Sequence, residues 1–298
     1  MNKVKKAVIP AAGLGTRFFP ATKTIPKEML PIVDKPTILY VVEEAMQAGI
    51  EDIILIAGRG KHSIEDFFDL SYEVEDKLMS EGKSDLLKSL NDIRANVNII
   101  SIRQKNALGL GHAINCARPV VGREPFAVLL GDEITISKSR DQNVTHFLTE
   151  KFNQTKESSV WVLPVDPKDT SKYGIVNLGE QKFSDLALGQ RILGVVEKPV
   201  PASAPSLWAL PGRYVFSAEI FDHLDQIKTG KGGEYQLSDA MGLLASGGVI
   251  NAYSFNTQRY DAGDKLGFLI ANLEVALGRT DLRHDLMEYM KNRVQKFS

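Results

Sequence analysis

Cysteine is nearly absent from this chain, and two further absences narrow its class. Among its 298 residues Cys116 is the one cysteine, so neither an internal disulfide nor a cluster of thiolate metal ligands can form. No apolar run approaches the ~20 residues of a membrane-spanning helix. The basic start at Lys3, Lys5 and Lys6 is not followed by the apolar segment of a signal peptide. We therefore expect a cytoplasmic protein that does not contact a membrane.

An excess of charge of either sign is also missing. Lysine and arginine together number 36, aspartate and glutamate number 37, and the net charge is −1. Because a general nucleic-acid binder carries a basic excess, this balance argues against nucleic acid as a partner. With 43% apolar residues the chain can bury a sizeable core, and its length suits one large α/β domain over residues 1–298. Any cationic site must be local.

Short β-branched runs alternate with helical patterns in the first half of the chain. The predicted strands are 6–10, 52–57, 97–103 and 126–130, and the predicted helices are 37–48, 109–117 and 144–153. This alternation predicts a Rossmann-like, doubly wound α/β fold with a mixed, mostly parallel sheet, whose ligands bind at the carboxyl ends of the strands. The charged stretch near 67–96 is predicted to be a helical insertion outside that core.

The second half differs in pattern. The predicted strands are 159–165, 174–178, 192–197, 213–216 and 249–255. Beyond them, residues 281–298 are predicted to form an amphipathic helix with one apolar face, made by Leu282, Leu286, Tyr289, Met290 and Val294. Such a face either packs into the core of its own chain or forms a contact between subunits.

What the chain does contain is a glycine-rich loop backed by cations. The run Ala11-Ala12-Gly13-Leu14-Gly15-Thr16-Arg17 follows an apolar strand, and Lys27 follows within the same proline-containing segment. Glycines let backbone N–H groups approach an anion, so with Arg17 and Lys27 the loop suits a triphosphate. A dinucleotide-binding loop would need a third glycine where Phe18 stands. A Walker A loop is matched neither here nor at residues 58–63.

Carboxylates follow two of the predicted strands. Asp132 and Glu133 end a buried-strand pattern, and a carboxylate there can hold Mg²⁺, which combines one or two protein carboxylates with substrate phosphates. Asp261 is the candidate for a second ligand. On its own, Asp261 is more typical of the N-cap of the following helix.

Two further segments carry candidate ligands. The amide of Gln104 can both donate and accept, which suits the edge of uracil, and Gly109 lets a base lie against backbone; a glycine-rich helix entry is the simpler interpretation. In the other segment, Gly174 would let a sugar ring approach the backbone, Glu197 could accept from its hydroxyls, and Lys198 could neutralise a phosphate. As ordinary surface residues, the three would have no functional meaning.

The blocks 11–17 and 26–31, together with these segments, resemble the sugar-1-phosphate nucleotidyltransferases over almost the whole chain, and most closely their bacterial branch that uses UTP and glucose 1-phosphate. The resemblance implies a nucleotide-binding half, 1–135, and a sugar-phosphate-binding half, 136–280. It implies Mg²⁺ on Asp132 and Asp261, with Glu133 outside the metal site. We also expect a homo-oligomer, either a dimer or a tetramer.

The resemblance also assigns roles to single residues. The implied nucleotide-binding residues are Ala11, Ala12, Gly13, Gly15, Thr16, Gln104 and Gly109. The implied sugar-phosphate-binding residues are Gly174, Asn177, Glu197 and Lys198. The implied catalytic residues are Arg17, Lys27, Asp132 and Lys198. Residues 232–239 match a further block of the family, to which we assign no contact.

The implied reaction is attack by the oxygen of glucose 1-phosphate on the α-phosphorus of UTP, with pyrophosphate leaving. Two alternatives stay open. One is a related enzyme with another base or sugar, such as a thymidylyl or guanylyl transferase, although the pair Ala11-Ala12 resembles uridylyl enzymes. The other is an inactive regulatory subunit that binds sugar nucleotides without turnover. Against it argues the presence of Arg17, Lys27, Asp132 and Lys198.

Overall fold

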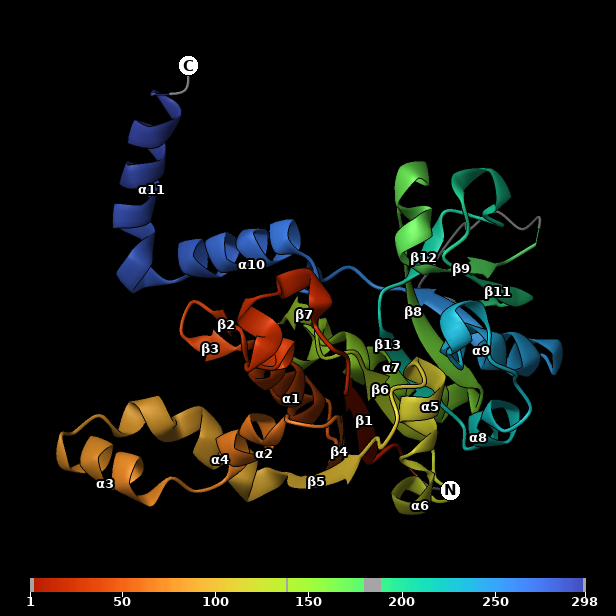
Figure 1. Ribbon diagram of the computed structural model, residues 1–298, viewed down its shortest axis with the longest axis horizontal. Coiled ribbons are helices and arrows are strands. Elements are labelled where there is room, and N and C mark those ends of the chain that lie inside the picture. The colour runs from red at the N-terminus through yellow and green to blue at the C-terminus, as the bar shows by residue number, and fades with distance from the viewer. Residues whose placement is uncertain (1–2, 138, 180–188, 297–298) are drawn as a thin grey trace.

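One mixed sheet forms the centre of the computed structural model, which describes residues 3–137, 139–179 and 189–296 (Figure 1). The strand order is β11-β9-β12-β8-β13-β6-β1-β4-β5, and β14 joins β8 and carries β10. The strands are β1 (Lys6–Ala11), β4 (Asp52–Ala57), β5 (Asn98–Arg103), β6 (Phe126–Leu129), β8 (Ser158–Pro164), β9 (Gly174–Asn177), β10 (Gln190–Arg191), β11 (Gly194–Glu197), β12 (Trp208–Leu210), β13 (Arg213–Phe216) and β14 (Ile250–Ser254).

The first half of the chain supplies most of the parallel part of the sheet, and β14 adds a parallel ladder to β8. β1 pairs in parallel with β4 and β6, and β4 pairs in parallel with β5. β13 continues the sheet from β6 in antiparallel fashion, and most strands beyond it are antiparallel. The longest ladders are parallel, so the predicted α/β class with a mixed, mostly parallel sheet is confirmed. Strand β12 was missed by the sequence analysis.

Helices cover both faces of the sheet. The α-helices are α1 (Thr37–Gln47), α2 (His62–Phe68), α3 (Tyr72–Ser80), α4 (Lys88–Asn96), α5 (Leu110–Asn115), α6 (Arg118–Val121), α7 (Val144–Thr155), α8 (Glu219–Leu224), α9 (Leu237–Ser246), α10 (Lys265–Gly278) and α11 (Thr280–Val294). One apolar core packs α1, α2, α4 and α7 on the sheet, and a second packs α5, α6, α8 and α9 on the other face. Along β1, Val8 faces the second core and Ile9 the first, because strand side chains alternate.

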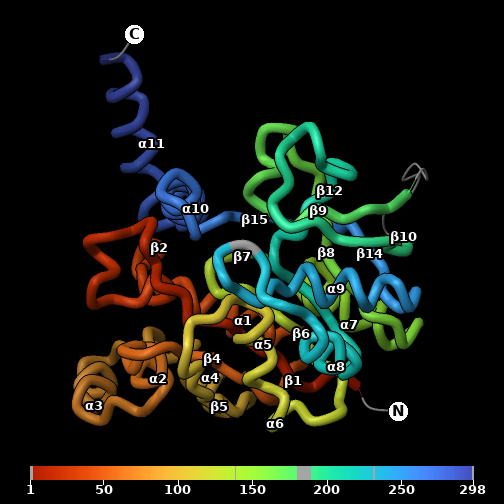
Figure 2. The backbone as a smooth tube through the Cα atoms, turned by 45° about the vertical axis from the view of Figure 1, so that its right-hand side comes forward, coloured from red at the N-terminus to blue at the C-terminus, as the bar shows by residue number. Residues whose placement is uncertain are grey.

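Two small sheets lie beside the main one. β7 (Glu133–Ile136) pairs antiparallel with β15 (Gln258–Asp261), and β2 (Pro31–Ile32) pairs with β3 (Lys35–Pro36). Figure 2 shows β7 and β15 side by side although they lie far apart in the sequence. The pairing places Asp261 opposite Glu133 and thus beside the end of β6.

The stretch 67–96 is helical, as predicted, and contains α3 and α4. In Figure 1, α3 lies away from the sheet at the lower left, and Tyr72 at its start is 78% exposed. Ile93 of α4, in contrast, is buried in the first core. None of the helices in the described part of the chain combines the length and apolar character that crossing a membrane requires.

Helix α11 stands away from the body of the molecule and packs against α10 (Figure 1). Its predicted apolar face is present, but no residue of α11 is buried, and Tyr289 and Val294 are more than half exposed. Of the two roles expected for this face, a place in the core of its own chain is therefore wrong.

Candidate active site

The glycine loop follows β1 and bends over a lysine. Gly15 has a φ of 67°, a left-handed conformation that glycine adopts without steric cost, and its carbonyl accepts from the Thr22 hydroxyl at 2.7 Å. A Cβ atom on Gly13 would lie 3.8 Å from the Lys27 Nζ atom. The loop backbone therefore runs directly past a cation, as the sequence predicts for a site that takes a polyphosphate.

A cavity of about 480 Å³ opens beside this loop. The predicted residues that line it are Ala12, Gly13, Gly15, Thr16, Lys27, Gln104, Gly109 and Asp132. Ala11 is not among them: it is fully buried in β1, and its side chain belongs to the core. The predicted nucleotide residues thus converge on one space, with Ala11 behind it.

Gln104 and Gly109 are held in place by the chain itself. The Gln104 amide nitrogen lies 3.2 Å from the Gly109 carbonyl and 2.8 Å from His112 Nδ1. Gly109 has a φ of 98°, and a Cβ atom there would meet the Tyr235 carbonyl at 2.9 Å. Close packing against Tyr235 therefore requires a glycine at position 109. His112 orients the Gln104 amide, a role that could not be seen in the sequence.

A second cavity, of about 250 Å³, adjoins the first. The predicted residues that line it are Arg17, Asp132, Gly174, Glu197, Lys198 and Asp261. Both cavities are lined by Asp132, Leu130, Leu110 and Glu234, so Asp132 lies at their junction. Asn177 does not line this cavity, because it lies at the other end of β9 and accepts from the Gly179 amide at 3.0 Å.

The sugar-phosphate candidates meet on paired strands. Gly174 on β9 lies opposite Glu197 on β11, and a Cβ atom on Gly174 would be 3.4 Å from the Glu197 Oε2 atom. Lys198 has a φ of 45°, which is unfavourable for a residue with a side chain and typical of functional sites. Its amide donates to the Tyr173 carbonyl at 3.0 Å, and its Nζ atom lies 3.2 Å from Glu197 Oε1.

The two aspartates predicted to hold a metal share one cradle. A Cβ atom on Gly263 would lie 2.7 Å from Asp132 Oδ2 and 3.0 Å from Asp261 Oδ1, so the two carboxylates flank this glycine. Asp261 accepts from the Gly263 amide at 2.8 Å. It does not cap α10, because Asp264 is the N-cap and accepts from the Gly267 amide.

The chemistry of this cradle fits a hard cation. Among the described residues no three His, Cys, Asp or Glu side chains form a metal-binding group. Two carboxylate oxygens beside a space for phosphate are nevertheless the donors that Mg²⁺ uses when substrate completes its shell.

Lys27 and Asp132 form an ion pair across the cradle, with Nζ and Oδ2 2.6 Å apart. Burial opposes ionisation of both groups, but the attraction between them prevails: the pKa of Asp132 is lowered and that of Lys27 is raised. Burial raises the pKa of Asp261. Arg17 donates to the Gly263 carbonyl at 3.3 Å, so its guanidinium lies at the turn that the two aspartates flank.

The sequence analysis missed several residues of the second cavity. Glu234 and Gln236 line it, and they belong to the block 232–239, to which no contact was assigned. Tyr173 also lines this cavity, and in the sequence only its position before Gly174 indicated a role. Arg259 binds the Glu133 carboxylate with two hydrogen bonds and contacts Tyr173. In the sequence, only its position two residues before Asp261 indicated that Arg259 lies near the site.

Comparison with known proteins places this geometry in a family. Residues 6–276 match the family described as Nucleotidyl transferase. The chain is 46% identical over 296 residues to the UTP--glucose-1-phosphate uridylyltransferase of Bacillus subtilis (strain 168), with 99% of each chain covered.

Solved structures agree with these relatives. A UDP-glucose pyrophosphorylase complexed with UDP-glucose has a TM-score of 0.84 at 41% identity and covers 93% of this chain and 100% of its own. A UTP-bound UGPase from Acinetobacter baumannii has a TM-score of 0.86 at 39% identity and covers 96% and 98% respectively. The fold, the converging loops and these matches agree, and the chain belongs to the nucleotidyl transferase family.

Proposed function

We propose that this chain transfers the uridylyl group of UTP to glucose 1-phosphate, which forms UDP-glucose and releases pyrophosphate. The observation that carries the proposal is the meeting of two cavities at Asp132: one is lined by the glycine loop and Gln104, the other by Gly174, Glu197 and Lys198. The UTP--glucose-1-phosphate uridylyltransferase of Bacillus subtilis and the two solved structures with UDP-glucose or UTP bound match the chain over nearly its full length, which supports the proposal.

The reaction needs no protein nucleophile. An oxygen of glucose 1-phosphate attacks the α-phosphorus of UTP, a new P–O bond forms, and the bond to the β-phosphate oxygen breaks. The attacker is already an anion at neutral pH, so catalysis reduces to placing two polyanions and neutralising charge. Lys198 binds the attacking phosphate, and Arg17 and Lys27 stabilise the charge that builds on the leaving pyrophosphate.

Binding of the organic parts follows from the same geometry. The Gln104 amide, oriented by His112, recognises uracil together with backbone at Gly109, and Glu197 accepts from the hydroxyls of glucose beside Gly174. We propose Mg²⁺ as the metal that Asp132 and Asp261 hold, where it neutralises phosphate charge. Chelation should then abolish turnover, and Mg²⁺ should restore it.

The function is tested by offering the purified chain UTP, dTTP, GTP or ATP with glucose, galactose or glucosamine 1-phosphate, and measuring pyrophosphate. We expect UTP with glucose 1-phosphate to give the highest kcat/KM. A preference for dTTP or GTP would assign the chain to another branch of the family. No release with any pair would support an inactive binding protein.

Arg17→Ala should act on turnover more than on binding. Its guanidinium stabilises the negative charge that develops on the leaving pyrophosphate. Loss of one preorganised donor of this kind lowers kcat on the order of 10²-fold. Steady-state kinetics with varied UTP measures this effect. A kcat within a few-fold of the wild type, with only the KM for UTP raised, would make Arg17 a binding residue.

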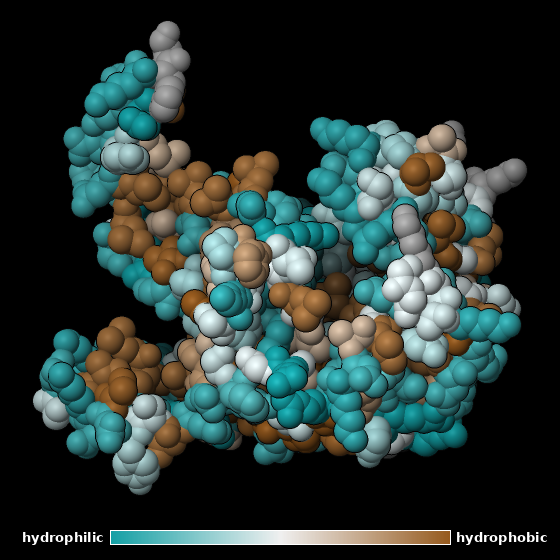
Figure 3. All heavy atoms as spheres, in the orientation of Figure 1, coloured by the Kyte–Doolittle hydropathy of each residue, from teal (hydrophilic) through white to brown (hydrophobic). Residues whose placement is uncertain are grey.

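We further propose that the chain forms a dimer or tetramer through α10 and α11. Figure 3 shows apolar side chains gathered over α10 and its junction with α11. On α10, Leu266 and Leu269 are 67% and 65% exposed, and on α11 Met287 and Val294 line an apolar groove of about 580 Å³. An exposed apolar face of this kind is typical of an interface.

Sedimentation of the wild type and of a Leu269→Asp, Met287→Asp variant tests the assembly. We expect the wild type to sediment as a dimer or tetramer and the variant to shift toward the monomer with an unchanged circular dichroism spectrum. A His284→Asp variant controls for added negative charge on the same helix, because His284 is exposed and does not line the groove. A monomeric wild type at micromolar concentration would contradict the assignment of this face.

A further inference from the structure

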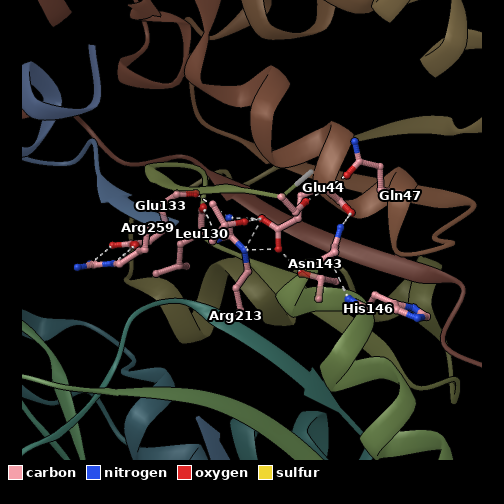
Figure 4. A network of polar contacts seen from close by, with 11 residues as sticks. Glu44, Gln47, Leu130, Glu133, Asn143, His146, Arg213 and Arg259 are labelled. Carbon is pink, nitrogen blue, oxygen red and sulfur yellow. Dashed lines mark hydrogen bonds and ion pairs between the residues drawn. The ribbon is translucent and has the colours of Figure 1, made fainter. Parts of the chain in front are cut away.

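The turn that carries Asp132 is held by a buried arginine that lines neither of the two cavities. Arg213 on β13 has no exposed surface. Its NH1 atom donates to the Leu130 carbonyl at 3.2 Å, and its NH2 atom donates to the Glu133 carbonyl at 2.7 Å. These carbonyls lie on either side of Asp132. Figure 4 shows the guanidinium between them and the carboxylate of Glu44.

Glu44 on α1 fixes the orientation of this guanidinium. Its carboxylate accepts from Arg213 Nε at 3.0 Å and from NH2 at 2.7 Å, and it is 3% exposed. The remaining capacity of the carboxylate is filled by the hydroxyls of Thr135 at 2.6 Å and Thr145 at 2.5 Å. The guanidinium makes four hydrogen bonds from one rigid plane, two to the Glu44 carboxylate and two to carbonyls, whereas an ammonium group has only three donors.

The outer side of the same turn is held by β15. The Ala262 amide donates to the Asp132 carbonyl at 2.8 Å, and Arg259 donates to the Glu133 carboxylate at 2.5 and 2.6 Å. Glu133 is thus hydrogen-bonded to Arg213 through its carbonyl and to Arg259 through its side chain. Three carbonyls of the turn 130–133 are bound, so the direction of the Asp132 side chain is set from both sides.

Stability alone does not account for a buried ion pair at this place. Replacing such a pair with well-packed apolar groups is often neutral or stabilising, because desolvation cancels much of the attraction. A metal site, in contrast, needs its carboxylate fixed, and loss of an outer partner typically lowers metal affinity by 10–100-fold. We propose that Arg213 is a positioning residue: its buried guanidinium fixes the turn 130–133 and thereby places the Asp132 carboxylate at the junction of the two cavities.

The inference rests on the proposed metal-binding role of Asp132, and the test separates the two. The variants are Arg213→Met, Arg213→Lys and the double variant Glu44→Gln, Arg213→Met. The double variant removes both charges and keeps an amide whose oxygen can accept from one of the two threonine hydroxyls, Thr135 or Thr145, while its NH2 group donates to the other. We expect Arg213→Met to unfold about 10 °C lower than the wild type, since it strands a buried carboxylate, and the double variant to recover most of that loss.

Three readouts distinguish positioning from stability: hydrogen exchange, Mn²⁺ affinity and kcat. Hydrogen exchange at residues 130–136 of the ligand-free chain should be faster in all three variants, including the double variant. Mn²⁺ affinity in the presence of UDP-glucose, followed by electron paramagnetic resonance below the unfolding range, should fall on the order of tenfold or more. The kcat should fall with it, while the KM for UTP stays within a few-fold.

Arg94→Met is the matched control, because Arg94 forms a two-bonded pair with Glu75 far from the cavities. It should lower stability without changing Mn²⁺ affinity. If exchange, Mn²⁺ affinity and kcat of the double variant return to wild-type values together with its stability, Arg213 only stabilises the fold, and the inference is wrong. If the wild type binds no Mn²⁺, the metal role of Asp132 fails, while exchange at 130–136 still decides the role of Arg213.

Discussion

Asp132→Asn should lower kcat on the order of 10³-fold while the protein stays folded. The amide has the shape of the carboxylate but lacks the charge that a hard cation prefers, and it leaves the Lys27 ammonium without its 2.6 Å partner. Because Asp132 lines both cavities, the substitution affects the point where the two substrates meet. Activity across a Mg²⁺ titration, together with thermal unfolding, measures both expectations.

Asp261→Asn extends this test to the second proposed ligand. Asparagine can still accept from the Gly263 amide, so the loop should persist, and we expect turnover to fall by a similar factor. Asp264→Asn is the matched control, because Asp264 caps α10 and asparagine is an equally good N-cap. A fully active Asp261→Asn enzyme with unchanged Mg²⁺ dependence would leave Asp132 as the sole protein ligand.

Lys198→Ala should reduce kcat/KM on the order of 10³-fold for every sugar 1-phosphate alike. The reason is that the proposed ligand of the Lys198 ammonium group is the phosphate, which all these substrates share. Glu197→Ala should instead reduce the ratio of kcat/KM for glucose 1-phosphate to kcat/KM for galactose 1-phosphate, since a polar partner of the sugar hydroxyls is lost. The measurement is kcat/KM for both sugars in each variant.

Lys172→Ala controls for loss of a cation from the same cavity, because Lys172 is already paired with Asp169 at 2.8 Å. It should leave both sugars nearly unaffected. An equal loss of selectivity in the Glu197 and Lys198 variants would contradict the division between sugar and phosphate.

The convergence of the glycine loop, Gln104 and Asp132 on one cavity could be predicted from the sequence, because each follows a strand of the parallel part of the sheet. The glycine loop follows β1, Gln104 follows β5 and Asp132 follows β6. The carboxyl ends of such strands meet at one edge of a sheet, so local patterns were enough to bring these residues together.

The link between Asp132 and Asp261 could not be predicted from spacing. It depends on the pairing of β7 with β15, two strands of four residues each that the sequence pattern does not reveal. The resemblance to a family supplied that link. Likewise, Arg213 looks like an ordinary charged residue at the start of a strand, and its burial follows only from the packing of α1 on the sheet.

The proposed reaction is a single displacement at the α-phosphorus of UTP, and its stereochemical course tests that displacement directly. The substrate is a single diastereomer of UTP with sulfur on the α-phosphorus, and the configuration of the UDP-glucose analogue formed from it is determined. A direct attack by glucose 1-phosphate predicts inversion at phosphorus. Retention would require two displacements through a uridylyl group bound to the protein, and would contradict the mechanism derived from this site.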